Sequence, residues 1–171
     1  MHRKVKATFV SAFIPALLAM GFSAQAQSSG EAKRSLVVSL QDRKLALLED
    51  GRVKKVYVVA VGKRSTPSPT GTFKIISRVN NPTYSHAGKV VAPGRGNPVG
   101  TRWMGLSVKG YGIHGTNVPS SIGKAASHGC IRMRQEDLEE LFDLVHVGAV
   151  VELRGERPEL PAQVLAANSV N

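Results

Sequence analysis

The sequence contains a single cysteine, Cys130, among its 171 residues. One cysteine cannot form an intramolecular disulfide, build a cysteine-rich zinc site or make a two-cysteine redox motif. It is therefore a small buried residue, a spare surface thiol or a nucleophile. A buried thiol would leave its polar neighbours His128 and Arg132 unsatisfied, and Gly129 allows close approach of a substrate. From spacing alone, a structural thiol and a nucleophile both remain open.

Acidic residues are scarce, with 12 Asp and Glu against 23 Lys and Arg, which gives a formal charge of +11. A positive balance of this size favours an anionic surface or polymer as partner. Nucleic acid is the usual choice for such a charge. Because the N-terminus indicates export, we expect no nucleic acid and favour cell-wall polymer or an anionic membrane face.

No apolar run is long enough for a confident membrane span. Basic residues at the start are followed by an apolar stretch over 7–22 and by Ala24-Gln25-Ala26, which fits the small-x-small cleavage rule. We therefore predict a signal peptide over 1–26, with a retained anchor as the alternative. Since no lipobox cysteine or sortase-type anchor is present, the expected location is the periplasm.

Removal of residues 1–26 lowers the formal charge to +8 and leaves a chain suited to one domain. We expect a linker over 27–34, a catalytic domain over 35–153 and a C-terminal tail over 154–171. In an oxidising compartment a spare thiol invites oxidation, so an unpaired Cys130 is easier to understand as a working group.

Short runs rich in Val, Leu and Ile predict a mainly β domain with one principal helix. Asp50-Gly51 is a strong hairpin signal, and the prolines of Thr66–Gly71 exclude a central strand there. The expected strands are Leu36–Leu40, Leu45–Leu48, Val53–Val61, Phe73–Val79, Thr101–Val108, Ile113–His114 and Ala149–Leu153.

The helix is expected from about Arg134 to His146. Its apolar residues Leu138, Leu141, Phe142 and Val145 recur at i, i+3, i+4 and i+7, which places them on one face. The irregular segment 80–100 is interpreted either as a functional loop or as a solvated connection.

Two strings carry most of the functional information: Ile113-His114-Gly115-Thr116-Asn117 and Ser127-His128-Gly129-Cys130-Ile131-Arg132-Met133. Together they closely resemble the signature of the L,D-transpeptidase (YkuD-domain) family, cysteine enzymes that remodel bacterial peptidoglycan. The resemblance runs from about Ser35 to Leu153. It implies a β-sandwich-like catalytic domain, with segment 80–100 as a flap or rim over the active site.

The resemblance also implies the roles of individual residues. Cys130 would be the nucleophile and His114 the base, oriented by the backbone carbonyl of Gly115. A backbone N–H at Gly129 would stabilise the oxyanion. A thiolate paired with His114 would alkylate well below the ordinary cysteine pKa of about 8.5.

Substrate contacts are assigned to Arg132, Ser127, His128, Tyr84 and Trp103. The guanidinium of Arg132 suits the carboxylates of stem peptides, although an internal ion pair with Asp137 is the alternative. Ser127 also fits a role in the turn, and His128 either supports the thiol or competes as the base. Trp103 fits either the acyl-donor groove or the core.

The resulting functional hypothesis is an exported peptidoglycan L,D-transpeptidase that needs no cofactor. Its partners would be stem peptides and a wall-anchored lipoprotein as a further acceptor, and carbapenem-type β-lactams would acylate it. The alternatives are an L,D-carboxypeptidase that uses water and a non-catalytic wall-binding module. A zinc site is disfavoured because the five histidines form no HxH or HxxxH pair.

Overall fold

The computed structural model describes residues 32–155. The predicted signal peptide, most of the linker and all but the first residues of the tail lie outside the described residues, so these predictions stay untested. The described part is mainly β with one α-helix, which confirms the predicted fold class. Within residues 32–155 no helix is long and apolar enough to cross a membrane.

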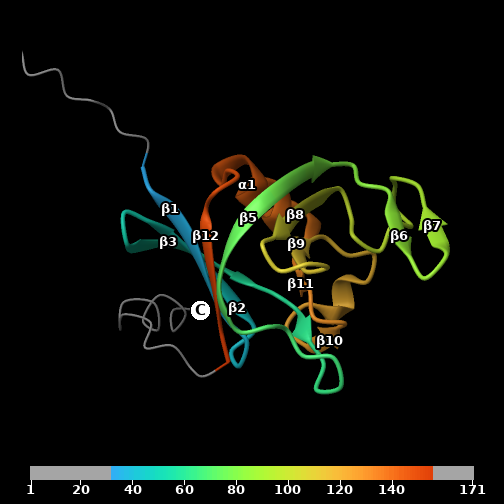
Figure 1. Ribbon diagram of the computed structural model, residues 1–171, viewed down its shortest axis with the longest axis horizontal. Coiled ribbons are helices and arrows are strands. Elements are labelled where there is room, and N and C mark those ends of the chain that lie inside the picture. Colours follow the sequence, from blue (N-terminus) through green and yellow to red (C-terminus); the bar gives the residue numbers. More distant parts are fainter. Residues whose placement is uncertain (1–31, 156–171) are drawn as a thin grey trace, which may run out of the picture. The chain divides into compact units, whose positions relative to one another are not determined.

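Most of the strands belong to an eight-stranded sheet with the order β11-β9-β8-β5-β12-β1-β2-β3. Figure 1 shows β1, β2, β3 and β12 on one side of the long, curved β5, and β8, β9 and β11 on the other. The strands are β1 (Arg34–Ser39), β2 (Lys44–Glu49), β3 (Arg52–Val58), β4 (Val61–Gly62), β5 (Gly71–Asn80), β6 (Tyr84–His86), β7 (Lys89–Val91), β8 (Arg102–Leu106), β9 (Gly112–His114), β10 (Ala125–Ser127), β11 (Ile131–Arg132) and β12 (Val150–Arg154).

Strand β5 joins the two halves of the sheet. Its residues 71–74 pair with β12, and its residues 75–80 pair with β8, with a register shift between Ile75 and Ser77. An irregularity of this kind bends the strand and increases its twist. The sheet therefore curls at β5, so that β8, β9 and β11 form a separate wall.

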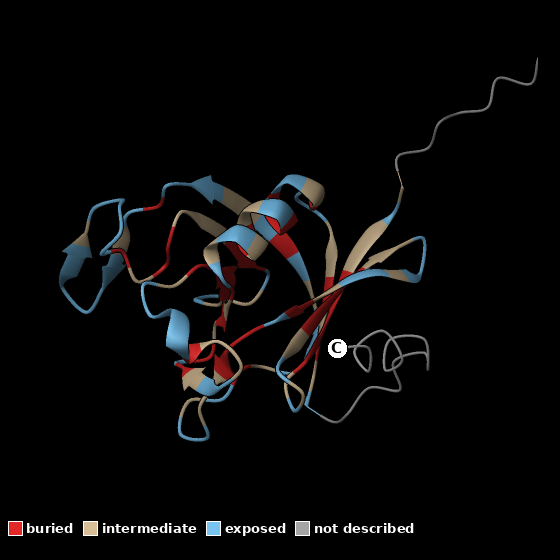
Figure 2. Ribbon diagram, turned by 180° about the vertical axis from the view of Figure 1, so that it is seen from behind, coloured by how far each residue is buried: buried red, intermediate tan, exposed pale blue. Residues whose placement is uncertain are grey.

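Helix α1 spans Gln135–Leu144 and is slightly shorter than predicted. Leu138, Leu141 and Phe142 are buried, as is Val145 directly after the helix, so the predicted apolar face is confirmed. These residues belong to the same core cluster as strands β8, β9 and β11. Figure 2 shows buried stretches on α1 and on the strands beside it.

Two expectations for the strands were wrong. The single strand predicted over Val53–Val61 is divided into β3 and β4, because Ala60 leaves the hairpin and bridges to Arg132 instead. Segment 80–100 is not all loop, since it contains the antiparallel hairpin of β6 and β7.

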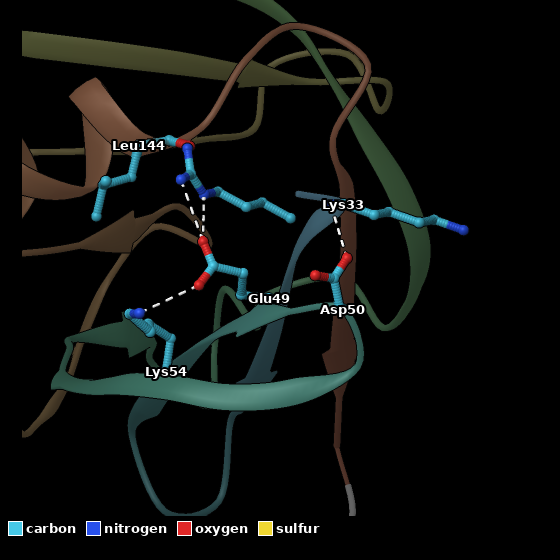
Figure 3. A network of polar contacts seen from close by, with 6 residues as sticks. Lys33, Glu49, Asp50, Lys54 and Leu144 are labelled. Carbon is cyan, nitrogen blue, oxygen red and sulfur yellow. Dashed lines mark hydrogen bonds and ion pairs between the residues drawn. The ribbon is translucent and has the colours of Figure 1, made fainter. Parts of the chain in front are cut away.

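A polar network holds the C-terminal end of α1 against the sheet (Figure 3). Arg34 on β1 donates to the carbonyl of Leu144 and forms an ion pair with Glu49 on β2. Glu49 also forms an ion pair with Lys54 on β3. Ion pairs this exposed contribute little to the free energy of unfolding, so the network mainly fixes the position of the helix end.

Candidate active site

Strands β9 and β11 place the two sequence motifs side by side. They pair in parallel, with Ile113 opposite Ile131 and His114 opposite Arg132. Side chains alternate across a strand, so the two isoleucines share one face and His114 and Arg132 share the other. Both isoleucines are fully buried in the core, which leaves the opposite face of this wall for the site.

Trp103 extends this face onto β8. Its antiparallel pairing places it opposite His114, and the two rings stack with centroids 5.5 Å apart and planes inclined by 19°. The indole lies where a side chain on Gly112 would be, since a Cβ there would come within 2.6 Å of the ring. Trp103 therefore both packs internally and lines the cavity, and its contact with the acyl donor stays a prediction.

His114 is buried, with 5% of its surface exposed, and its Nδ1 lies 2.6 Å from the carbonyl oxygen of Gly115. A carbonyl oxygen only accepts, so Nδ1 carries the hydrogen and Nε2 keeps a lone pair. The bond to Gly115 is the one that the resemblance implied. This tautomer suits His114 to accept a proton at Nε2.

Cys130 directly precedes β11 and is half-buried. Its sulfur lies 3.7 Å from the carbonyl oxygen of Gly110 and accepts from the backbone N–H of Gly112. Burial raises the pKa of the thiol, and the Gly112 N–H and the charge of Arg132 oppose that rise only in part. The resting thiol is therefore protonated at neutral pH.

Burial lowers the pKa of His114 to about 4, against the opposing effect of its bond to Gly115. Arg132 adds to the lowering, because a neighbouring cation disfavours the imidazolium. A buried thiol and a buried imidazole are both most stable uncharged here. The expected thiolate–imidazolium pair is thus replaced by a neutral pair in the resting site, and alkylation well below pH 8.5 is no longer expected.

The loop before Cys130 is held by Ser127. The Ser127 hydroxyl donates to the carbonyl of Cys130 at 2.6 Å and accepts from the N–H of Gly129 at 3.0 Å. With 1% of its surface exposed and its hydroxyl engaged on both sides, Ser127 stabilises the turn. Its contact with substrate stays a prediction.

The same bond engages the N–H of Gly129 in the resting turn, and the role of Gly129 as oxyanion donor stays a prediction. Gly129 has φ +112°, and a Cβ there would lie 2.5 Å from the ring of Tyr111, so only glycine fits. The backbone N–H of Cys130 forms no hydrogen bond within residues 32–155. This N–H is therefore unengaged at the turn.

Cys130, His114 and Arg132 open onto one cavity of about 740 Å³. His128 is exposed at its edge, and Tyr84 and His86 enter it from the β6–β7 hairpin. All the residues predicted to touch substrate thus border the same space. The complete lining is Val79, Pro82, Thr83, Tyr84, Ser85, His86, Pro98, Val99, Trp103, Gly110, His114, Ser127, His128, Cys130 and Arg132.

Arg132 is the only lysine or arginine in the lining. Among residues 32–155 it forms no ion pair, and its buried Nε has no hydrogen-bond partner. The internal ion pair with Asp137 is therefore not formed. The guanidinium remains available to an anionic group in the cavity.

Two contributions were missed from the sequence. The segment Lys109-Gly110-Tyr111-Gly112 supplies both backbone groups that contact the sulfur. The spacing of its glycines was the available signal. No pattern in the sequence singled out Asn97, which lies within the irregular segment 80–100.

In the described part of the chain, no three His, Cys, Asp or Glu side chains are grouped so as to hold a metal.

Comparisons with known proteins identify the family. A family model described as the L,D-transpeptidase catalytic domain, YkuD, matches residues 33–153. The YkuD protein of Bacillus licheniformis is 46% identical over 118 residues, which are 69% of this chain and 64% of that relative. This chain thus spans about 64% of the length of that relative.

Solved structures share the fold. The catalytic domain of the E. faecium L,D-transpeptidase is 27% identical with a TM-score of 0.59, over 71% of this chain and 96% of that domain. LD transpeptidase LdtMt1, solved in complex with imipenem, is 21% identical with a TM-score of 0.61, over 72% of this chain and 59% of the other. With its family-model match over 33–153, the chain belongs to the L,D-transpeptidase (YkuD) catalytic-domain family.

Proposed function

We propose that this protein is an exported peptidoglycan L,D-transpeptidase with Cys130 as nucleophile and His114 as general base. The observation that carries the proposal is the shared cavity, in which Cys130 is accessible and His114 holds a lone pair on Nε2. Family membership supports the reaction class, and the signal peptide predicted over 1–26 supports export to the periplasm.

The acyl donor would be a tetrapeptide stem that ends in D-alanine. The sulfur attacks the carbonyl carbon at the L-centre of the diamino acid while the thiol proton moves to His114 Nε2. Collapse of the tetrahedral anion breaks the C–N bond, and Nε2 returns the proton to the departing D-alanine amine. An acceptor amine then attacks the thioester, loses a proton to Nε2, and the C–S bond breaks as the sulfur regains its proton.

A neutral pair of Cys130 and His114 in the resting site suits this order of reaction steps. General base catalysis requires an imidazole that is unprotonated before attack, and a pKa of about 4 keeps His114 neutral at neutral pH. The backbone N–H of Cys130 would stabilise the tetrahedral anion. Loss of one such donor typically costs roughly 3 kcal/mol of barrier.

Recognition of the donor would rest on charge. The sequence from 51 to 135, which builds the whole cavity, contains no Asp or Glu. Arg132, without an internal partner, would bind a stem carboxylate through its planar fork. Tyr84, Trp103 and His128 would contact the rest of the peptide.

The acceptor is tested with a purified disaccharide tetrapeptide. Amine transfer between stems releases D-alanine and gives a cross-linked dimer, whereas the carboxypeptidase alternative releases D-alanine without dimer. A wall-anchored lipoprotein offered as acceptor should gain a stem on a lysine. If no D-alanine is released under any of these conditions, the proposal fails and the non-catalytic wall-binding alternative gains support.

Carbapenem-type β-lactams should acylate Cys130, because they imitate an acyl donor. The imipenem complex of a protein with the same fold supports this expectation. Intact-mass measurement after incubation with imipenem should show one adduct, and a Cys130→Ala variant should show none. An unmodified wild-type mass after long incubation would contradict it.

A further inference from the structure

Asn97 is a buried polar side chain beside the active site, with 1% of its surface exposed. It lies between the β6–β7 hairpin and β8, directly before the cavity residues Pro98 and Val99. A buried amide costs free energy unless both its ends are hydrogen-bonded. Both ends of Asn97 are bonded, and they lead to different parts of the site.

The nitrogen end holds the hairpin. Asn97 Nδ2 donates to the carbonyl of Pro82 at 2.8 Å, before β6, and to those of Val91 and Ala92 at 3.3 and 3.2 Å, where β7 ends. One side chain therefore joins the beginning and the end of the hairpin. The hairpin carries Tyr84 and His86 into the cavity and forms one of its walls.

The oxygen end holds a turn. Asn97 Oδ1 accepts from the N–H of Val99 at 2.9 Å, and the N–H of Gly100 donates to the Asn97 carbonyl at 3.1 Å. This turn directs the carbonyl of Val99 at the N–H of Gly115, which lies 2.9 Å away. Gly115 is the residue whose carbonyl orients the ring of His114.

Close packing makes this second connection rigid. A Cβ on Gly100 would lie 2.8 Å from the Cα of Gly115, so the two backbones are in direct contact. The carbonyl of His114 accepts from the N–H of Met133 at 2.9 Å. The peptide between His114 and Gly115 is thus held from both sides, by Val99 and by Met133.

We propose that Asn97 is a positioning residue that couples the substrate wall to the base: its Nδ2 sets the β6–β7 hairpin and its Oδ1 sets the turn that aligns Gly115 and His114. The kinetic part of this inference rests on the proposed function. The two halves of the amide predict different kinetic defects, and this difference makes the proposal testable.

Asn97→Asp keeps an oxygen for the Val99 N–H but turns a second acceptor toward three carbonyls. It should release the hairpin while the turn persists, so KM for the tetrapeptide donor rises about tenfold or more with kcat changed less than about threefold. Asn97→Ala removes both ends of the amide. It should raise KM similarly and also lower kcat about tenfold or more.

Asn117→Ala is the matched control. Asn117 also donates its amide to a backbone carbonyl in this region, that of Gly96 at 3.1 Å, but it is exposed and this hydrogen bond leads neither to the hairpin nor to Gly115. Its KM and kcat should stay within about twofold of wild type. Equal kinetic constants in all folded variants, or equal losses of kcat in Asn97→Asp and Asn97→Ala, would overturn the proposal.

Two measurements work without catalysis and separate this inference from the proposed function. Trypsin should cleave at Lys89, in the hairpin, at least about tenfold faster in Asn97→Asp than in wild type, with cleavage at Lys124 unchanged. In the unchanged protein, the amides of the hairpin and of Gly115 should exchange hydrogen with the same opening equilibrium. Independent exchange, or unchanged cleavage at Lys89, would refute the coupling even if the protein is an active transpeptidase.

Discussion

At His114, burial outweighs the hydrogen bond that would otherwise stabilise the imidazolium. The short bond from Nδ1 to Gly115 raises the pKa of His114. The pKa still falls to about 4, because the ring stacks on Trp103 and is almost fully removed from water. The consequence is a base that is always ready to accept a proton at neutral pH. The same burial makes folding sensitive to acid.

The lowered pKa of His114 predicts a specific loss of stability. In the unfolded chain a histidine titrates near 6.5, so between pH 6.5 and about 4 the unfolded state binds more protons than the folded one. Stability from this group is complete above pH 6.5 and falls by about 1.4 kcal/mol per pH unit as the pH decreases toward 4. Urea unfolding of wild type and His114→Gln across this range should show a shallower slope in the variant.

His86→Gln is the control for this measurement. His86 is an exposed histidine on β6, so its replacement controls for the loss of a histidine side chain as such. If His114→Gln loses stability with acid as steeply as wild type does, the imidazole is not held neutral by the fold, and the assigned protonation state is wrong.

Residue types and motif spacing indicated the pair Cys130 and His114 and the bond to Gly115. The fate of individual N–H groups could not be deduced in this way. Whether the Gly129 N–H is free depends on the rotamer of Ser127, and whether the thiol is ionised depends on burial by β9 and β11. The burial arises only when segments distant in sequence come together, and the Ser127 rotamer is not specified by residue type or spacing.

At the scale of elements, the two β-hairpins show what local sequence can and cannot indicate. Asp50-Gly51 connects β2 and β3 with φ of 51° and 77°, as expected for a two-residue turn with left-handed backbone. The tip of the β6–β7 hairpin, Ala87-Gly88, has nearly the same angles, 48° and 76°. Alanine rarely adopts this conformation, so its sequence carried no hairpin signal, and Asn97 supplies the stabilisation from outside the turn.

Helix α1 was predictable because its packing face repeats within one short segment. The division between β3 and β4 was not, since it depends on a bridge from Ala60 to Arg132, 72 residues further along. Local periodicity therefore describes the helix and the first hairpin. The wall that carries the active site depends on pairings between distant strands.

The packing between β8 and β9 requires a glycine at position 112. A Cβ there would lie 2.6 Å from the indole of Trp103 and 2.8 Å from the carbonyl of Met104, and the backbone partner cannot move freely. We expect Gly112→Ala to destabilise the fold by roughly 1–3 kcal/mol through overpacking. Because Trp103 stacks on His114, donor turnover should also fall.

Urea unfolding and donor turnover of Gly112→Ala test this prediction. Gly96→Ala is the matched control, since a Cβ at position 96 meets nothing within 4 Å. Its stability and activity should resemble those of wild type. A Gly112→Ala variant as stable and as active as Gly96→Ala would show that the indole does not occupy this space.

Over the whole molecule, charges are segregated along the chain. Residues 51–135 carry no acidic side chain, whereas α1 alone contains Glu136, Asp137, Glu139, Glu140 and Asp143. The helix is therefore an acidic strip on an otherwise basic domain. The cavity belongs to the acid-free part, so attraction of an anionic wall polymer should act near the site.

This arrangement predicts salt-sensitive binding to isolated cell wall. Because screening shortens the range of charge interactions from roughly 10 Å at 0.1 M salt to roughly 3 Å at 1 M, binding of a Cys130→Ala variant should fall several-fold over that interval. Adding Lys89→Glu, on the hairpin, should weaken binding at 0.1 M salt. Adding Glu136→Lys, the matched change on α1, should not, and salt-independent binding would contradict the electrostatic account.

The acyl-enzyme itself gives the most direct test of the chemistry assigned to Cys130 and His114. Wild type, Cys130→Ala and His114→Gln are mixed with disaccharide tetrapeptide and sampled by intact-mass spectrometry over time. The account predicts a wild-type adduct equal in mass to the donor without D-alanine, none on Cys130→Ala, and an adduct on folded His114→Gln that forms at least about a hundredfold more slowly. Release of D-alanine by Cys130→Ala at the wild-type rate would contradict it.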